Sequence, residues 1–167
     1  MPAPASEWAE AYKEQARADM NGARLVQGRE ASVLAMLLQM VLEKLGKAAL
    51  LRGNKLTIDK ARASHAAATR MVQLLGVDRR ACERLRWAPS VLKQRVAPLV
   101  QQLERAHPQI AAKGPCLEYP WEDSSAKVLW PARHLSVAAM FGPKHPDGLL
   151  VFRFADALCR EFDAVFQ

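Results

Sequence analysis

Hydrophobic residues cover almost every side of one stretch of the chain, residues 30–52. This stretch lacks proline and has a single glycine, Gly46, so the pattern predicts one long helix. A helix that is apolar on all sides must be buried on all sides, which predicts a central helix in an all-α domain. Its apolar run, residues 33–42, is too short to span a membrane, because a span takes about 20 residues. The hydrophobic side chains of the stretch include Val33, Leu34, Met36, Leu37, Leu38, Met40, Val41, Leu42 and Leu45.

Amphipathic patterns predict further helices around this central one. Apolar residues recur at helical spacing in residues 7–26, 57–76, 90–106, 132–141 and 150–165. Pro98 lies inside one of these helices and should kink or split it. Short connections favour antiparallel neighbours, so we expect an up-down bundle of five or six helices.

Two segments break the helical pattern. Residues 1–6 form a Pro/Ala-rich tail that we expect to be frayed, with Ser6 capping the first helix. Turn residues make residues 108–130 an irregular loop or a small hairpin, in which residues 116–119 and 127–130 could pair as strands. Trp121 and Trp130 are expected to seal the end of the core. The whole chain, residues 1–167, is predicted to be a single domain.

The net charge of +7 is concentrated in the middle of the chain. Residues 44–77 carry seven basic residues and one acidic residue, and residues 78–110 carry seven and three. This asymmetry favours a polyanionic partner, although a solvated basic surface would give the same pattern. The three cysteines are widely spaced and odd in number, which argues against a disulfide framework or a zinc knuckle. With no signal-peptide pattern at the N-terminus, we expect a cytoplasmic protein.

His65 is the sharpest candidate residue, because it occupies the apolar seam of the helix predicted at 57–76. Together with four residues near it in the predicted bundle, it could hold a phosphate in a polar pocket. The alternative is a buried histidine bonded to Glu43, with Glu43 and Lys47 forming an ion pair at i and i+4. The residues of this candidate phosphate site are Glu43, Lys44, Lys47, Arg62 and His65.

A second candidate is a short basic segment that ends in tryptophan. Cations beside an aromatic ring suit single-stranded nucleic acid, through phosphate contacts and base stacking. A solvated basic surface between helices is the alternative. The candidate nucleic-acid-binding residues are Arg79, Arg80, Arg84, Arg86 and Trp87.

The sequence has no Gly-rich phosphate loop, paired cysteines, His-x-x-x-His or Gly-x-Ser-x-Gly motif. It therefore predicts no cofactor and no metal site, and it does not identify a class of enzyme.

Several short motifs, in their order along the chain, resemble those of the HEPN superfamily. This family comprises small helical domains of prokaryotic defence and toxin–antitoxin systems. The pieces are residues 12–23, the Glu-Lys-x-x-Lys-Ala of residues 43–48, the Ser-His of residues 64–65, and the Tyr-Pro-Trp loop of residues 118–122. Glu118 stands where the family usually has arginine.

Many HEPN proteins are metal-independent ribonucleases with an Arg-x(4–6)-His motif. No arginine stands at that distance before any of the four histidines, and Lys60 before His65 is a poor substitute for its planar fork. The resemblance therefore implies a non-catalytic module that binds a nucleotide, a nucleic acid or a nucleotidyltransferase-type partner, as a homodimer. A ribonuclease with a degenerate motif, using His65, and a protein–protein adaptor are the alternatives.

Overall fold

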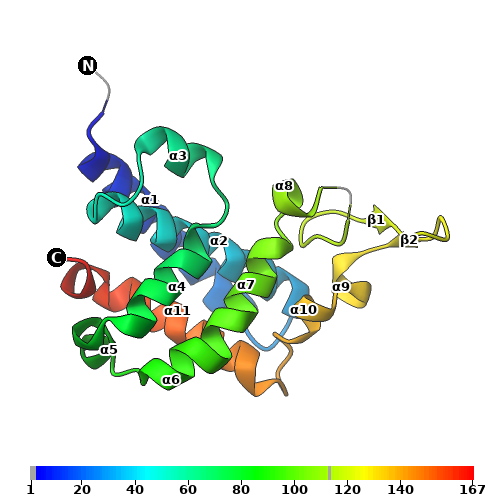
Figure 1. Cartoon of the computed structure of the whole chain (residues 1–167). Helices are drawn as coiled ribbons and strands as arrows, with labels where there is room; N and C mark the ends of the chain where they lie inside the picture. Colours follow the sequence, from blue (N-terminus) through cyan, green and yellow to red (C-terminus); the bar gives the residue numbers. More distant parts are fainter. Residues whose placement is uncertain (1–2, 113) are drawn as a thin grey trace.

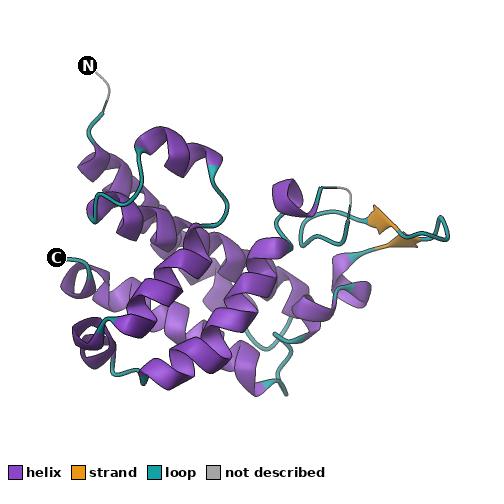
Figure 2. Ribbon diagram, in the orientation of Figure 1, coloured by secondary structure: helices purple, strands orange, loops and turns teal. Residues whose placement is uncertain are grey.

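The computed structural model describes residues 3–112 and 114–167, and these residues are mostly helical (Figure 2). This confirms the prediction of a helical fold. The helices are α1 (Ala5–Val26), α2 (Ala31–Arg52), α3 (Ile58–Ala63), α4 (Ala67–Val77), α5 (Arg79–Leu85), α6 (Pro89–Val91), α7 (Ala97–Arg105), α8 (Pro108–Ala111), α9 (Pro131–His134), α10 (Ser136–Ala139) and α11 (Pro146–Val165). A π-helical segment, η1 (Leu92–Val96), joins α6 to α7, and the strands are β1 (Trp121–Glu122) and β2 (Val128–Leu129).

Helix α2 lies at the centre, as its apolar pattern predicts. It contacts α1 along its length and also α4, α7, α10 and α11 (Figure 1). Fourteen of its 22 residues are buried, and they include Leu38, Leu42 and Leu45 at the middle of the core. None of the helices within the described residues is both long enough and apolar enough to cross a membrane.

Helix α1 begins earlier than expected, and part of the predicted tail belongs to it. Ala5 and Ser6 are helical, and the N-cap is Pro4 instead of Ser6. Pro4 is extended, with ψ at 159°, and its carbonyl accepts hydrogen bonds from the amides of Glu7 and Trp8. Residues 1–2 of the predicted tail lie outside the described residues.

The helix predicted over residues 57–76 is divided into α3 and α4, which makes the helical segments more numerous than the five or six predicted. Thr57 caps α3, as expected, by accepting a hydrogen bond from the Lys60 amide. Ser64 then adopts an extended conformation, and α4 starts where its backbone meets Gly46 of α2. A β-carbon at Gly46 would lie 2.5 Å from the carbonyl oxygen of Ala67, so the start of α4 approaches α2 more closely than any side chain at position 46 would allow.

Pro98 is accommodated by a local change in backbone hydrogen bonding and does not end the helix. In η1, directly before it, the amide of Ala97 bonds to the carbonyl of Leu92 in the π-helical manner. Proline has no amide hydrogen and its ring crowds the carbonyl four residues earlier, so one wider turn accommodates it. The α6–η1–α7 segment therefore runs as one helix from Pro89 to Arg105.

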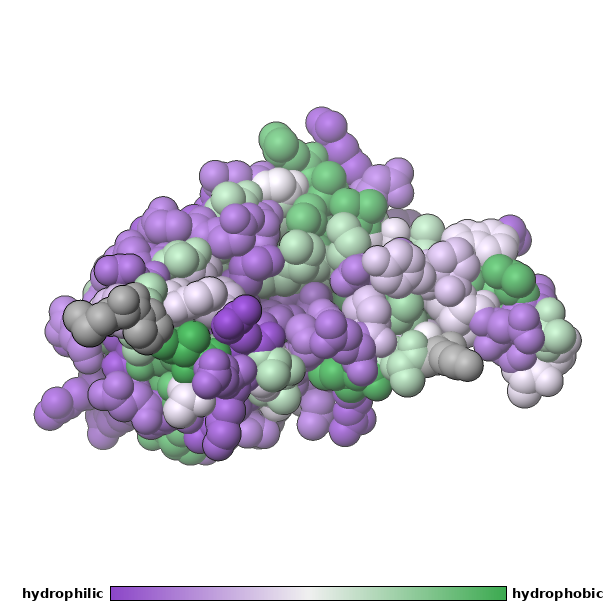
Figure 3. Space-filling model, turned by 90° about the horizontal axis from the view of Figure 1, so that it is seen from above, coloured by the Kyte–Doolittle hydropathy of each residue, from purple (hydrophilic) through white to green (hydrophobic). Residues whose placement is uncertain are grey.

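The segment from α8 to α9 projects from one end of the helical body (Figures 1 and 3). It contains the small antiparallel hairpin, in which Trp121 pairs with Leu129. The prediction located β2 correctly but placed its partner too early, because Leu117 is buried and donates its amide hydrogen bond to Ala106 instead. Trp121 is buried at the core edge, whereas Trp130 is 42% exposed, so the prediction that it seals the core is wrong.

Candidate functional sites

One cluster of polar side chains forms around Glu43 on the buried helix α2. Its Oε1 atom lies 2.7 Å from Lys47 Nζ and 3.0 Å from His65 Nδ1, and its Oε2 atom accepts a hydrogen bond of 2.8 Å from Gln39. Burial raises the pKa of Glu43, but the hydrogen bond and charge of Lys47, helped by Gln39 and His65, outweigh it. The pKa therefore lies below its usual value, and Glu43 is a carboxylate at neutral pH.

His107 completes this cluster, although sequence reasoning did not connect it to His65. The two imidazole rings stack with centroids 3.9 Å apart and planes 19° apart. The Nδ1 atom of His107 accepts the amide hydrogen of Gln109 and so caps α8. Burial, and then the charge of His65, lower the pKa of His107. No spacing rule links positions 65 and 107; the only sequence signal is that His107 precedes a proline at a helix start.

The three donors Glu43, His65 and His107 lie within 4.8 Å of one another, which raises the question of a metal ion. A metal lies in the plane of each imidazole that binds it, because the nitrogen lone pair lies in that plane. Two rings stacked almost in parallel cannot share one ion in that way, and Nδ1 of His107 is engaged by a backbone amide. The geometry therefore favours a hydrogen-bonded cluster over a metal centre.

The phosphate site predicted from the sequence is not assembled around Glu43. Lys44 points to Asp19, with its Nζ atom 2.6 Å from that carboxylate, and the Arg62 guanidinium lies over the ring of Trp8 at 5.7 Å. Of the predicted site, only Lys47 and His65 contact Glu43, and the contacts are those of the structural alternative. The cluster is unsuited to an anion because the charge of Lys47 is already neutralised.

The predicted nucleic-acid-binding residues lie on and just after α5. Asp78 caps this helix by accepting the amide hydrogen of Ala81, and Arg86 ends it in a left-handed conformation with φ at 59°. The four arginines of the helix region are exposed: Arg79, Arg80, Arg84 and Arg86. Trp87 differs from the prediction, since its ring packs edge-on against Phe154 at 5.5 Å and forms part of the core edge.

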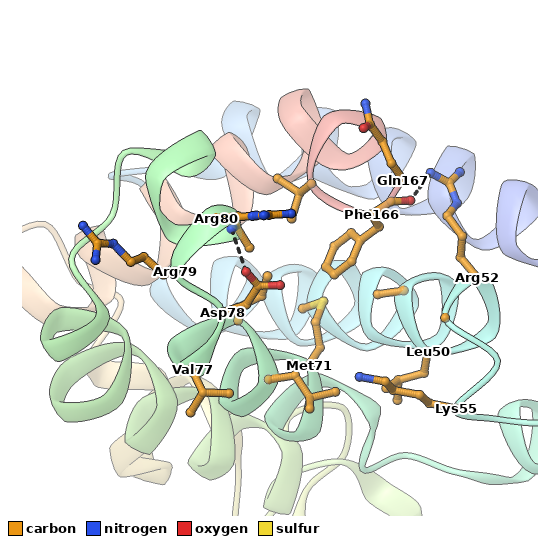
Figure 4. A pocket seen from close by; sticks show the side chains of 16 residues that line it. Leu50, Arg52, Lys55, Met71, Val77, Asp78, Arg79, Arg80, Phe166 and Gln167 are labelled. Carbon is orange, nitrogen blue, oxygen red and sulfur yellow. Dashed lines mark hydrogen bonds between the residues drawn. The ribbon is translucent and has the colours of Figure 1, made fainter.

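A cavity of about 640 Å³ opens beside these arginines, between α2, α4, α5 and the end of α11. Four basic residues and one acidic residue, Asp78, line it. The basic ones are Arg52, Lys55, Arg79 and Arg80. Between them the lining is apolar: the side chain of Phe166 points toward Met71, which is only 1% exposed and belongs to the core (Figure 4). Sequence reasoning found Arg79 and Arg80 but missed the cavity, because its walls come from segments far apart in the chain.

Comparison with known proteins gives no match. No model of a protein family fits the sequence, and neither curated proteins nor solved structures show significant similarity to it. The resemblance to HEPN proteins thus rests on the short motifs quoted above and stays a prediction.

Proposed function

We propose that this protein is a non-catalytic, HEPN-like helical module that binds single-stranded nucleic acid by its phosphates. The observation that carries the proposal is the row of exposed arginines on α5 beside a cavity with a basic lining. Exposed cations grouped on one element provide the sequence-independent part of nucleic-acid affinity. Arg79 is the one that forms an ion pair with a neighbour on α5, Glu83, and both partners are largely exposed, so this pair competes weakly with a phosphate.

Further expectations come with the HEPN-like part of the proposal. A homodimer, a nucleotidyltransferase-type partner and a part in defence or toxin–antitoxin function follow from the resemblance. The up-down bundle topology and a cytoplasmic location are expectations from the sequence patterns and belong to the same proposal. A nucleotide is an alternative ligand of the same phosphate-binding groups. An adaptor that docks an acidic protein on the basic face would instead form a complex that survives nuclease treatment.

The test is fluorescence anisotropy with a labelled single-stranded RNA in EDTA, over a range of salt. We expect affinity to fall as salt rises, with a slope of roughly −0.7 per phosphate contact. The variant R79A/R80A/R84A should bind at least about tenfold more weakly and show a shallower slope. The matched control is K60A/R62A/R70A, which removes the same charge from exposed positions outside α5. Absent binding, or equal loss in both variants, would overturn the proposal.

A degenerate ribonuclease is the second candidate, and one observation favours it. Stacked histidines beside a carboxylate are groups that can give and take protons, so His65, His107 and Glu43 together offer general acid–base chemistry. This candidate predicts RNA cleavage in EDTA that is lost in both H65A and H107A. Intact RNA after incubation with the wild-type protein excludes it.

A further inference from the structure

We propose that the cavity between α2, α4, α5 and the end of α11 is a subsite for one nucleoside phosphate. The base would lie against the partly exposed ring of Phe166, and the phosphate between Arg80 and Lys55. This inference rests on the proposed function, since Arg79 and Arg80 belong both to the cavity and to the arginine row of α5. It adds a defined ligand, a defined place and a base contact, none of which the arginine row requires.

The size and lining of the cavity fit such a ligand. Its volume of about 640 Å³ falls within the range of small-molecule sites, roughly 300–1,000 Å³. Inorganic phosphate would leave the apolar walls of the cavity exposed to water. A purely apolar molecule would bury the cations without a partner of opposite charge. Phe162 packs against Phe166 in a tilted arrangement, with ring centroids 4.8 Å apart. The side chain of Phe166 points into the cavity (Figure 4). Aromatic rings of this kind stack bases without regard to their identity.

Of the four basic residues that line the cavity, Lys55 and Arg80 carry the positive charge that no acidic side chain of the described residues neutralises. Arg52 is held by Asp163 and by the carbonyl of Phe166, and Arg79 is held by Glu83. Within residues 3–112 and 114–167, neither Lys55 nor Arg80 forms an ion pair with an acidic side chain. Both extend along the cavity from opposite sides (Figure 4).

Lys55 is placed there by an ordered turn. Asn54 adopts a left-handed conformation, with φ at 53°, and the amide of Lys55 then bonds back to the carbonyl of Leu50 at 2.8 Å. Asparagine tolerates this conformation better than most residues, and such a turn is a common end for a helix. The lysine is therefore returned toward the last turn of α2, where it lines the cavity.

The single acid of the lining does not cancel this charge. One carboxylate oxygen of Asp78 accepts the amide hydrogen of Ala81, so Asp78 is engaged as the cap of α5. Lys55 and Arg80, whose charges no acidic partner in the described part of the chain neutralises, outnumber it around the cavity, which leaves the lining positive. A ligand with a phosphate group is thus favoured over a neutral nucleoside.

The nucleoside phosphate has two possible sources, a free nucleotide or the terminal nucleotide of a strand bound along α5. Calorimetry of the full chain with AMP, UMP, adenosine and inorganic phosphate tests the subsite itself. We expect both nucleotides to bind, and adenosine and phosphate alone to bind at least about tenfold more weakly. Anisotropy with an internally labelled RNA separates the two sources, because the RNA can be linear with a 5′-phosphate or circular without an end. Tighter binding of the linear form assigns the site to a strand end. Equal binding of both forms assigns it to the free nucleotide.

Variants make the test specific to the cavity. K55Q and F166A should each weaken nucleotide binding about tenfold, whereas R70Q, on α4 but outside the lining, should not. Because F166A removes packing against Phe162, thermal unfolding is measured for each variant. If F166A is unfolded, K55Q decides the test, since Lys55 is exposed and its replacement should leave the fold intact. RNA binding without nucleotide binding, or nucleotide binding unchanged in K55Q, would overturn the subsite and leave the proposed function standing. Nucleotide binding without RNA binding would support the subsite and overturn the proposed function.

Discussion

The buried carboxylate of Glu43 contacts Lys47, His65 and Gln39, and its negative charge compensates the positive charge of Lys47. The side chain of Lys47 is only 6% exposed, so its ammonium group depends on Glu43 for compensation. Replacing Glu43 by glutamine keeps the shape but leaves a buried, unpaired cation. We expect E43Q to lower the free energy of unfolding by about 3–5 kcal/mol, measured by urea denaturation.

The double variant E43Q/K47M is the control for this charge effect. Methionine fills a similar volume without a charge, and replacing both partners of a buried pair is far less costly than removing one. The double variant should therefore recover most of the stability lost in E43Q. A loss below about 1 kcal/mol in E43Q would mean that Lys47 reaches water when Glu43 is neutral.

His107 makes stability depend on pH just below neutrality. Its folded pKa lies below the usual 6.5, chiefly because of burial and then because of the charge of His65. The unfolded chain therefore takes up a proton first, so stability is complete above pH 6.5 and falls as pH drops toward the folded pKa. The lowered pKa of Glu43 acts in the same direction only below 4.5, and the raised pKa of Glu104, caused mainly by burial, acts in the opposite direction.

The variant H107N isolates this effect, because asparagine can still cap α8 but does not titrate. Urea midpoints of the wild type should decline between pH 7.5 and 5.5, and those of H107N should decline less. Parallel curves for the two proteins would assign the pH dependence to another group.

At the level of elements, the contact between α2 and α4 depends on the absence of a side chain at Gly46. A β-carbon there would lie 2.5 Å from the Ala67 carbonyl oxygen, and that partner is backbone, which cannot rotate away. Alanine at this position gains about 1 kcal/mol of helix propensity but must push α4 aside. We expect G46A to destabilise the protein by about 1–3 kcal/mol net, in chemical denaturation.

Gly22 of α1 offers a matched comparison, since it too is a glycine inside a long helix. A β-carbon there would meet only the side chain of Leu37, at an ordinary 3.7 Å. G22A should therefore stabilise the protein by up to about 1 kcal/mol. If both substitutions moved stability in the same direction, helix propensity rather than close packing would govern Gly46.

Sequence patterns captured the long elements and missed what three-dimensional packing decides. The apolar period of α1, α2 and α11 is long enough to identify each as a helix from local pattern alone. The break at Ser64 lies beside the contact of Ala67 with Gly46 on another helix, and no local pattern reports a contact between helices. The same limit applies to the sites: the His65–Glu43 contact was foreseen, but His107 and the cavity walls join segments whose proximity no short motif encodes.

For the molecule as a whole, Asp163 of α11 links the packing of three helices to the charge of the cavity. Its carboxylate is contacted by Lys13 and Arg17 of α1 and by Arg52 of α2, the last at 2.8 Å. Hydrogen bonding from Arg52 contributes most to the lowered pKa of Asp163. Arg52 lines the cavity, so the ion pair that ties α11 to α2 also withholds one cation from a ligand.

Replacing Asp163 by asparagine should therefore have opposite effects on stability and binding. The side chain is 54% exposed and its basic partners keep contacts with Glu10 and Glu14, so the loss of stability should stay below about 1 kcal/mol. Arg52 would keep only the longer contact of 3.6 Å with Glu10 and the carbonyl of Phe166, so its charge should tighten nucleotide binding roughly two- to fivefold at low salt, and less at high salt. D156N is the control: it removes an acid from the same helix, where Asp156 pairs with Arg24 away from the cavity lining. Equal tightening in D156N would show that overall charge, and not the freed Arg52, draws the ligand to the protein.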